Sequence, residues 1–390
     1  MRKIVFFNIP AHGHINPTIE VVRELVSRGN RVYYYTYNDF RDKIEDTGAK
    51  FIALDGYDDR FKITQRDLSE ASNDLNYFVD FMVKKTLDID EIIFMDMMNI
   101  KPDCIVYDNM TIWGKMISLR LDIPSVCSNA SFVFNQYSVS ILRFNIRDII
   151  SAINPVSKVN KNIKKLRNRG YPVKNVLDIM RNKKDIHTIV YTSSEFQPFS
   201  HTFSDKYTFV GPSILKAKST IEKTKDKLIY ISMGTINNDV SSFYKNCIEA
   251  FRDTYYQVII SVGDRVHLDE FGDVGENISV FKNVDQIAVL KKADVFISHG
   301  GMNSVSESLY SKVPLIMFPQ TVEQRGVAER VRQLGAGIIL HRITPKNIRE
   351  AVDKVFNNPN YYKSANIIYD GFKECTGPKG AANKILEMCR

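Results

Sequence analysis

Residues Ala293 to Gln324 read ADVFISHGGMNSVSESLYSKVPLIMFPQTVEQ, and this stretch decides the fold. Val295 to Ile297 form a short apolar run with β-branched members, which is typical of a strand covered on both faces. The tripeptide His299-Gly300-Gly301 then breaks the chain before a helical stretch, and a second apolar run follows at Leu315 to Phe318. The order of strand, glycine turn, helix and strand predicts part of a parallel α/β sheet.

The start of the expected helix favours an anionic ligand. Asn303 or Ser304 can cap this helix, and its first turn presents unpaired backbone N–H groups at the positive end of the helix dipole. Glu307 lies one turn further on, where its carboxylate can accept hydrogen bonds from the vicinal hydroxyls of a ribose. We therefore expect a nucleotide, bound through its diphosphate.

The run H-G-G-M-N-S-x-x-E, followed by Pro319 and Glu323-Gln324, resembles the donor signature of nucleotide-diphosphate-sugar glycosyltransferases, in particular the bacterial macrolide and flavonoid branch. The resemblance implies a role for each matching position. His299 contacts the diphosphate and stabilises its charge, and Glu307 holds the ribose. The helix start from Gly301 through Asn303 to Ser304 binds the phosphates, and Glu323 and Gln324 hold the sugar hydroxyls. Glu323 departs from the more usual Asp by one methylene.

Two further segments resemble donor-binding parts of the family. Ser232 and Thr235 belong to a turn after the strand Leu228 to Ile231 that matches a phosphate-binding turn, although an ordinary strand-to-helix turn has the same appearance. Val284 lies in the stretch where many relatives carry an aromatic residue that stacks on the nucleobase. Here Asn283 takes the place of that aromatic residue and Asp285 the place of a proline, so the stacking platform is missing, with Phe281 as a substitute.

The N-terminus supplies an independent signal. Lys3 to Ile9 reads as a strand, and PAHGHINP leads from it into a helix expected over Thr18 to Ser27 and closed by Gly29. Loops at the carboxyl ends of parallel strands bind ligands. His14, in G-H-I-N-P, resembles the general base of the family, and an imidazole with a pKa of about 6.5 is suited to this task. His12 is the alternative.

Asp108 is the expected partner of this histidine. It ends the apolar run that starts at Cys104, so it lies at the carboxyl end of a second strand. A carboxylate in this position fixes the tautomer of the imidazole and stabilises the imidazolium that forms. An Asp at a strand end also serves as a helix N-cap, which is the structural alternative.

Strand-like and helical runs alternate along the chain, which predicts parallel sheets with helices on both faces. A length of 390 residues favours two domains, separated by a segment rich in Lys, Ser and Thr. We expect an N-terminal acceptor-binding domain over 1–210, a linker over 211–225, a C-terminal donor-binding domain over 226–377, and a last helix over 378–390 that returns to the first domain. The resemblance implies the glycosyltransferase B architecture, an α/β fold with two Rossmann-like doubly wound domains facing across a cleft.

Composition sets limits on location and partners. No apolar run reaches the length of a membrane helix, and the five scattered cysteines indicate a reducing cytoplasm without a metal cluster. The formal net charge is +8, and residues 156–185 hold ten Lys or Arg against two Asp. Such a run attracts anionic lipid or an acidic partner, although a solvated helix face is the commonest explanation. No nucleic-acid motif accompanies it. A monomer and a homodimer both remain open.

The sequence therefore predicts an inverting, metal-independent glycosyl transfer to a hydroxyl of a small hydrophobic acceptor, such as a macrolide or a phenolic compound. The expected co-substrate is a nucleoside-diphosphate sugar, UDP-glucose in the first place, with no other cofactor and no metal. Aromatic residues of the first half favour a lipophilic acceptor; they are Phe61, Tyr77, Phe78, Phe81, Phe132, Phe134 and Tyr137. A sugar-nucleotide epimerase and a non-catalytic nucleotide-sugar-binding protein are the alternatives.

Overall fold

A computed structural model describes residues 1–56, 63–64, 67, 70, 75–138, 156–175, 178, 186–234 and 241–389. The chain forms two compact units. The N-terminal unit comprises Met1–Tyr137, Phe144–Ser213 and Cys375–Arg390, and the C-terminal unit comprises Ile214–Glu374 together with Ser138–Arg143. Each unit is described by itself.

The N-terminal unit is built on a parallel sheet whose strand order is β3-β2-β1-β4-β5-β6-β7. In this order the chain moves outward from β1 in one direction and then returns to β4 on the other side, as in doubly wound folds. β1 and β4 are neighbours, with Phe7 in register with Tyr107. The strands are β1 (Lys3–Phe7), β2 (Arg31–Thr36), β3 (Lys50–Ala53), β4 (Cys104–Asp108), β5 (Ser125–Asn129), β6 (His187–Val190) and β7 (Tyr207–Phe209).

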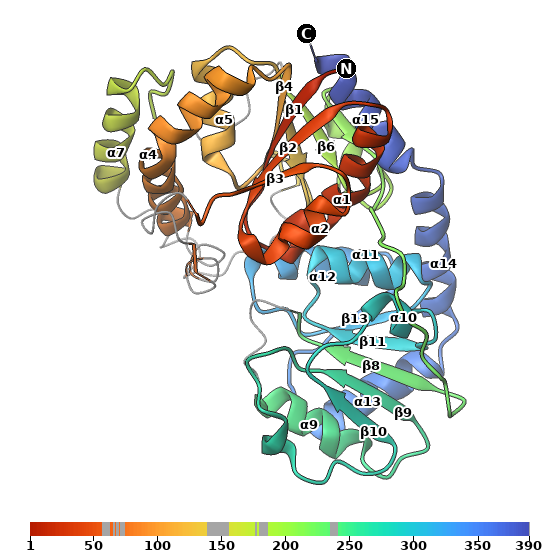
Figure 1. The fold of residues 1–390 in the computed structure, drawn as a ribbon. Coiled ribbons are helices and arrows are strands. Elements are labelled where there is room, and N and C mark those ends of the chain that lie inside the picture. Colours follow the sequence, from red (N-terminus) through yellow and green to blue (C-terminus); the bar gives the residue numbers. More distant parts are fainter. Residues whose placement is uncertain are drawn as a thin grey trace. The chain divides into compact units, whose positions relative to one another are not determined.

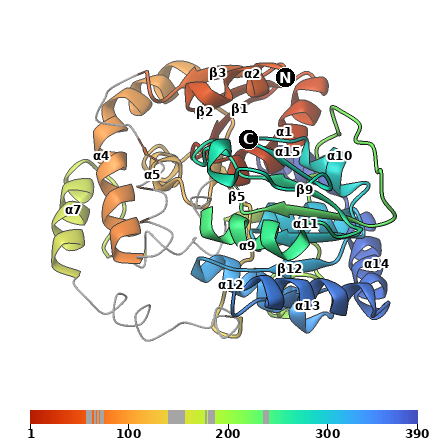
Figure 2. The same ribbon diagram turned by 90° about the horizontal axis from the view of Figure 1, so that it is seen from below.

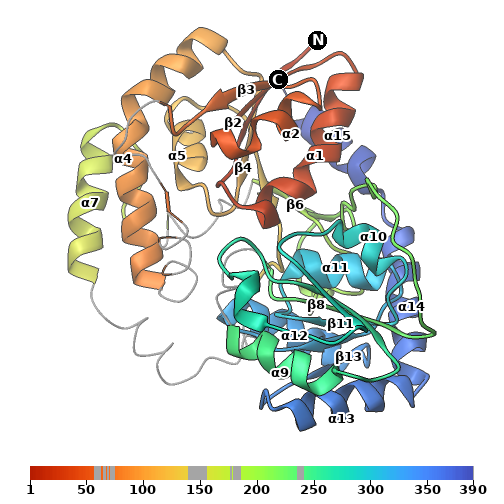
Figure 3. The same ribbon diagram turned by 60° about the horizontal axis from the view of Figure 1, so that its bottom comes forward.

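Helices cover both faces of this sheet (Figure 1). One face carries α1 (His12–Ser27), α2 (Arg41–Glu45) and α15 (Gly377–Met388), and α1 packs against α15. The other face carries α4 (Leu75–Ile100), α5 (Ile112–Arg120) and α7 (Val156–Asn168). Helices α4 and α7 lie side by side in Figure 2 and Figure 3.

The C-terminal helix belongs to the N-terminal unit. The backbone N–H of Gly377, at the start of α15, donates to the carbonyl of Val210 at 2.8 Å. Besides α1, helix α15 contacts β4 and β5. Short 3₁₀ turns lie at Asn38–Phe40 and Ser200–Thr202.

The C-terminal unit is built on a second parallel sheet with the order β10-β9-β8-β11-β12-β13. Its strands are β8 (Leu228–Ser232), β9 (Gln257–Ser261), β10 (Ile278–Phe281), β11 (Val295–Ser298), β12 (Leu315–Met317) and β13 (Gly337–Ile339). In Figure 1, one face carries α10, α11 and α12, and the other carries α9 and α13, while α14 packs against α11. The helices are α9 (Ser241–Phe251), α10 (Gln286–Leu290), α11 (Met302–Tyr310), α12 (Val322–Gln333), α13 (Pro345–Phe356) and α14 (Asn360–Lys373), with a 3₁₀ turn at Leu268–Phe271.

Alternate side chains of β8 point to opposite faces of the second sheet. Ile229 and Ile231 point into the apolar core that includes Phe243 of α9 and Ile348 of α13. Because successive side chains of a strand alternate between faces, Tyr230 points to the side of α10 and α11. Its ring stacks on that of Phe296, with the centroids 4.6 Å apart. The residues that follow the strands on this face are therefore held by packed strands rather than by loops.

The prediction of two parallel α/β sheets with helices on both faces is confirmed. None of the helices in the described part of the chain is long and apolar enough to cross a bilayer. Three strands, β7, β10 and β13, were not predicted. Each lies at an edge of its sheet and is only partly buried, so its sequence lacks the fully buried apolar run of a central strand.

The predicted start of α1 was wrong. Helix α1 begins at His12 rather than at Thr18, with Pro17 inside it. The φ of proline is helical, but at the sixth position of α1 its missing N–H removes one intrahelical hydrogen bond, and the helix nevertheless continues to Ser27. The far end agrees with expectation: Gly29 has φ +82°, and its N–H and that of Asn30 bond back to the carbonyls of Val26 and Leu25.

Candidate active site

His14 and Asp108 form a hydrogen-bonded pair in the N-terminal unit. The Nδ1 atom of His14 lies 2.7 Å from Oδ2 of Asp108. The aspartate side chain is fully buried, whereas 21% of the histidine side chain remains exposed. The other carboxylate oxygen accepts the backbone N–H of Met110 at 2.9 Å. Both oxygens of Asp108 are thus engaged, and its orientation is fixed.

The pair is brought together by the pairing of β1 with β4. His14 lies in the first turn of α1, directly after β1, and Asp108 is the last residue of β4. Thr111 ties these two strand ends together, because its hydroxyl donates to the carbonyls of Phe7 and Asp108 at 3.1 and 2.8 Å. Asn8 is buried and donates from Nδ2 to the carbonyl of His14 at 2.9 Å. Asn8 was missed in the sequence, although a polar residue directly after a buried strand is a signal.

This geometry makes His14 suitable as a base. An ionised carboxylate only accepts hydrogen bonds, so Nδ1 of His14 carries the proton and Nε2 keeps its lone pair. His12 is placed differently: its ring meets Phe40 edge-on, with the centroids 4.9 Å apart. Partial burial and the charge of Lys43 lower its pKa, against the opposite effect of Asp39. Within the described residues no carboxylate bonds to the ring of His12.

The C-terminal unit holds the second group of predicted residues. Ser232 ends β8 and lies in register with Ser298, which ends β11. Gly234 and Gly301 flank the ring of His299: a Cβ on Gly234 would lie 2.6 Å from Cε1, and one on Gly301 would meet Nε2. The imidazole therefore occupies a slot between two backbone segments that only glycine leaves open. Thr235, predicted to contact the phosphates, lies outside the described residues.

His299 is neutral near pH 7. Burial lowers its pKa from 6.5 to about 4. A neutral imidazole can donate a hydrogen bond to a phosphate oxygen, but it adds no positive charge. Any electrostatic stabilisation of a diphosphate at this position then comes from the adjacent helix.

Helix α11 begins earlier than predicted. Its N-cap is Gly301, without a side-chain cap, and not Asn303 or Ser304. These two residues lie in the first turn, where backbone N–H groups have no partner inside the helix. Gly300, with φ +80°, supplies the left-handed turn before it. Binding of an anion at this helix start stays a prediction, and it now rests on the backbone N–H groups of the first turn rather than on a side-chain cap.

Glu307 is part of a buried polar chain. The hydroxyl of Tyr230 donates to Oε1 of Gln286 at 3.1 Å, and Nε2 of Gln286 donates to Oε2 of Glu307. Only 9% of Glu307 is exposed. Gln286 thus orients the carboxylate, a role that the sequence interpretation did not assign, although Gln286 directly follows the segment from Asn283 to Asp285 that resembles a donor-binding part of the family.

Gln324 has a structural task besides its predicted one. Thr321 and Gln324 form a capping box at the start of α12, a pattern that the spacing T-x-x-Q could have revealed. Oε1 of Gln324 accepts the N–H groups of Gln320 and Thr321 at 2.7 and 3.2 Å. Its amide oxygen is therefore committed, and only its NH₂ group is left to donate. The neighbouring Glu323 is partly exposed in the first turn of α12.

The segment without the usual aromatic residue is organised by polar contacts. Nδ2 of Asn283 donates to Oδ1 of Asp264 at 2.8 Å, and Val284 is partly exposed beside it. Asp285 caps α10 by accepting the N–H of Ala288, and its other oxygen accepts the N–H of Ser219 at 2.9 Å. Asp285, which stands where the family usually has a proline, therefore connects the segment around Ser219 to the start of α10.

The predicted acceptor aromatics do not form one group. Tyr77 and Phe81 stack with their centroids 5.7 Å apart, and Phe132 is buried against Phe196. Phe134 and Tyr137 are exposed. Phe61 and the side chain of Phe78 lie outside the described residues.

The described residues contain no group of three or more His, Cys, Asp or Glu that could hold a metal ion. The chemistry present is that of an oriented base in one unit and a glycine-lined helix start in the other.

Comparisons with known proteins identify the family of the chain. Residues 247–388 match the family described as erythromycin biosynthesis protein CIII-like, C-terminal domain. The chain is 34% identical over 395 residues to NDP-glycosyltransferase YjiC of Bacillus licheniformis, covering 98% of this chain and 97% of that protein. It is 33% identical over 398 residues to the uncharacterized UDP-glucosyltransferase YdhE of Bacillus subtilis, covering 100% of this chain and 99% of that protein.

A solved structure extends the likeness to the fold. The calicheamicin glycosyltransferase CalG4 superposes with a TM-score of 0.81 at 25% identity, covering 100% of this chain and 98% of that one. Its fold is of the glycosyltransferase B type, which agrees with the two parallel-sheet units. The chain is thus an enzyme that transfers glycosyl groups, and it belongs to the bacterial macrolide- and flavonoid-type family of nucleotide-sugar glycosyltransferases.

Proposed function

We propose that this glycosyltransferase moves a sugar from a nucleoside-diphosphate sugar to a hydroxyl of a small hydrophobic acceptor, with inversion at the anomeric carbon and without a metal ion. The observation that carries the proposal is the bond between Nδ1 of His14 and the buried Asp108, because it leaves Nε2 of His14 as a base. The N-terminal unit is proposed to bind the acceptor, and the C-terminal unit the donor.

In the proposed reaction, Nε2 of His14 takes the proton of the acceptor hydroxyl, and Asp108 stabilises the imidazolium. The acceptor oxygen forms a bond to the anomeric carbon while the bond to the diphosphate oxygen breaks. A single displacement of this kind inverts the configuration. The leaving diphosphate receives hydrogen bonds from the first turn of α11 and from neutral His299, so the helix dipole supplies the positive potential.

UDP-glucose is the proposed donor and a bulky natural product the proposed acceptor. The donor is suggested by the name of YdhE as a UDP-glucosyltransferase, and the acceptor by the names of CalG4 and of the erythromycin-related family. Exposed Phe134 and Tyr137 offer apolar contacts to such an acceptor. The side-chain NH₂ group of Gln324 and the carboxylate of Glu323 are proposed to hold the sugar hydroxyls, as the resemblance implies.

The test is a mass-spectrometric screen of UDP- and TDP-sugars against a panel of phenolic, macrolide and lipid alcohols. The expected result is an acceptor whose mass rises by one hexose, formed with anomeric inversion and in the presence of a metal chelator. Loss of product on chelation would contradict metal independence. Consumption of the UDP-sugar without any acceptor would favour an epimerase. Binding of the nucleotide without turnover across the panel would favour a non-catalytic binding protein.

A further inference from the structure

Helix α7 carries a face that the proposed reaction does not use. On its inner side, Ile163 and Leu166 are buried, and α7 packs along α4. Asn162 is also buried there and donates from Nδ2 to Oδ1 of Asp80 on α4 at 2.8 Å. Because these three residues lie on one side of the helix, the opposite side is turned to solvent.

The solvent side of α7 is cationic. Lys161, Lys164 and Lys165 are exposed and follow the i, i+3, i+4 spacing, so they form one stripe along the helix. Arg167, in the last turn of α7, and Lys174, six residues after the helix, are also exposed. We call these five residues the cationic face. From residue 156 to residue 177 the chain holds seven Lys or Arg and no Asp or Glu.

The nearby carboxylates of α4 do not neutralise the cationic face. Asp80 is paired with Lys84 at 2.6 Å, besides its bond with Asn162. Asp90 is buried and accepts from Arg120 at 2.8 Å, from Arg169 and from the hydroxyl of Tyr171. Among the residues that the structure describes, the five cations of the face have no ion pair.

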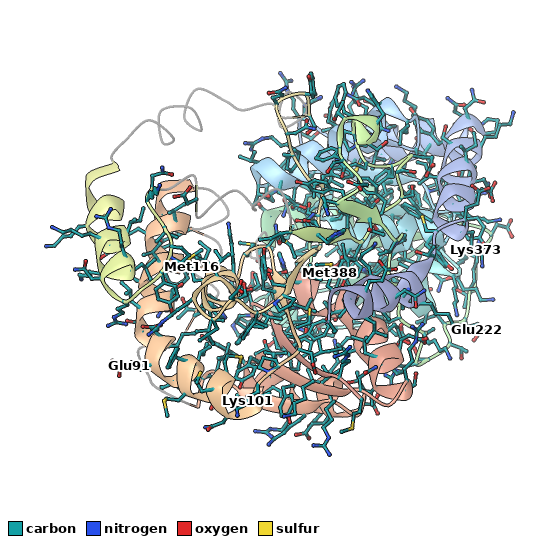
Figure 4. The ribbon with its side chains drawn as sticks, turned by 90° about the horizontal axis from the view of Figure 1, so that it is seen from above. Glu91, Lys101, Met116, Glu222, Lys373 and Met388 are labelled. Atoms are coloured by element: carbon teal, nitrogen blue, oxygen red, sulfur yellow. The ribbon has the colours of Figure 1, made fainter. Side chains whose placement is uncertain are left out.

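The same contacts hold the helix firmly. Arg169 and Tyr171 follow directly after α7, and both bond to Asp90 on α4. The face therefore presents its charges from a fixed platform. Glu91, the exposed acid next in sequence to Asp90, points away from the strands (Figure 4).

We propose that the cationic face docks the protein onto a lipid surface that carries anionic headgroups. Four to eight Lys or Arg residues gathered on an amphipathic helix are typical of binding to anionic lipids. The apolar side of α7 is already used against α4, so the contact is electrostatic and does not insert into the bilayer. A nucleic acid is the less favoured partner, because the exposed side of α7 offers no aromatic ring for bases to stack on.

Docking would place the enzyme where a hydrophobic acceptor collects. This benefit rests on the proposed function, but the docking itself does not, because it needs only the charges of α7. The two proposals therefore fail separately: vesicle binding tests one, and product formation tests the other.

The experiment compares sedimentation of the full chain with phosphatidylcholine vesicles and with vesicles that also contain phosphatidylglycerol. We expect binding only to the anionic vesicles. It should weaken steeply as salt is added, since the Debye length falls from about 10 Å at 0.1 M to about 3 Å at 1 M. Equal binding to both kinds of vesicle, or no binding to either, would overturn the proposal.

Two charge-matched variants locate the contact. The triple variant K161E/K164E/K165E should lower the apparent partition coefficient by about a hundredfold or more. The control variant K354E/K363E/K373E makes the same change of charge on exposed lysines of α13 and α14, where Lys373 is marked in Figure 4, and it should bind as the natural protein does. Melting temperature and UDP affinity serve as folding checks for both variants. Equal losses in the two variants would contradict a role for α7.

The nucleic-acid alternative is tested with the same proteins. Binding of single-stranded or duplex DNA is measured at the ionic strength used for the vesicles. We expect weaker binding of DNA than of anionic vesicles. Tighter binding of DNA that is lost in K161E/K164E/K165E would assign the cationic face to nucleic acid and overturn the lipid proposal.

Discussion

Nδ1 of His14 lies 2.7 Å from Oδ2 of Asp108, and the other oxygen of this carboxylate accepts the N–H of Met110. An ionised group without exposure to water is stable only when its hydrogen-bonding positions are occupied. Here the two partners occupy them and at the same time aim the imidazole. The pair thus combines a buried acid with a partly exposed histidine, as a base that acts on a bound alcohol requires.

Replacement of His14 by Ala should lower turnover by about 10²–10⁴-fold, the usual contribution of a general base. UDP affinity should stay within about twofold, because His14 belongs to the other unit. Asp108→Asn should also lower turnover strongly, since the amide can donate to Nδ1 and stabilise the wrong tautomer. Rates and UDP affinity are measured for each variant on the acceptor found in the screen.

The matched control for these variants is His12→Ala. His12 lies two residues before His14 in the same helix turn but contacts Phe40 instead of a carboxylate. Its turnover should remain within about tenfold of the natural enzyme. If His12→Ala abolished turnover and His14→Ala did not, His12 and not His14 would be the general base.

Much of the fold was readable from the sequence because its strands are buried on both faces. Such strands appear as unbroken apolar runs, as in Cys104 to Tyr107, and the runs at β8 and β11 were equally clear. Boundaries were harder. His12 and Gly13 look like turn residues and Pro17 like a breaker, yet the helix includes all three. His12 and Gly13 lie in its first turn, and the hydrogen bond lost at Pro17 weakens the helix without ending it.

The candidate site was readable only in part. A motif indicates which residues gather at a turn, and His299 and Glu307 do lie in the turn and the helix that follow β11. A motif does not report burial, and burial is what makes His299 neutral. A single sequence also does not show which side chains bond to the site residues. Examples are the hydrogen bonds from Asn8 to the carbonyl of His14 and from Gln286 to the carboxylate of Glu307.

Gly234→Ala should weaken donor binding through His299. The added Cβ would lie 2.6 Å from Cε1 of the imidazole, so the ring must move out of its slot. We expect UDP affinity to fall by about tenfold or more, which corresponds to ~1.4 kcal/mol. Gly272→Ala is the control, because Gly272 also has positive φ but a Cβ added there would meet no atom within 4 Å. It should reduce stability by about 1–3 kcal/mol, because its backbone conformation disfavours a Cβ, and leave affinity unchanged. Equal affinities for all three proteins would contradict contact of His299 with the donor.

A further variant tests whether the ring of Phe281 stacks on the nucleobase of the donor. Phe281 is 45% exposed and lies in register with Ser261, which in turn is in register with Ser232. It therefore shares the sheet face of the donor signature. Because stacking of a base contributes about 1–3 kcal/mol, Phe281→Ala should raise the dissociation constant of UDP at least about fivefold.

Two further variants complete this test. Asn283→Trp restores an aromatic residue at the position usual in the family and should tighten UDP binding. Tyr255→Ala removes a ring of the same unit that is 72% exposed, and it should have no effect. Calorimetric titration with UDP measures all three. An unchanged dissociation constant in Phe281→Ala would exclude this ring as the platform.

Glu307→Ala should chiefly weaken donor affinity. A hydrogen bond to a charged group contributes about 1.5–3 kcal/mol, so the dissociation constant of UDP should rise by about ten- to a hundredfold. Gln286→Ala should have a smaller effect of the same sign, because it only releases the carboxylate that Gln286 orients. The double variant should lose less than the sum of the two single losses. Strict additivity would show that Gln286 acts independently of Glu307.

His299 should make stability depend on pH in mildly acidic solution. Its folded-state pKa is about 4, below the ordinary 6.5, because burial disfavours the charged ring. Between these values the unfolded chain takes up a proton that the folded chain refuses, so the free energy of unfolding falls as the pH falls from about 6.5 to about 4. The loss reaches about 3 kcal/mol at most. Denaturant unfolding of His299→Gln should show a flatter pH dependence than the natural protein. Parallel curves for the natural protein and His299→Gln would mean that the ring is hydrated and charged near pH 5.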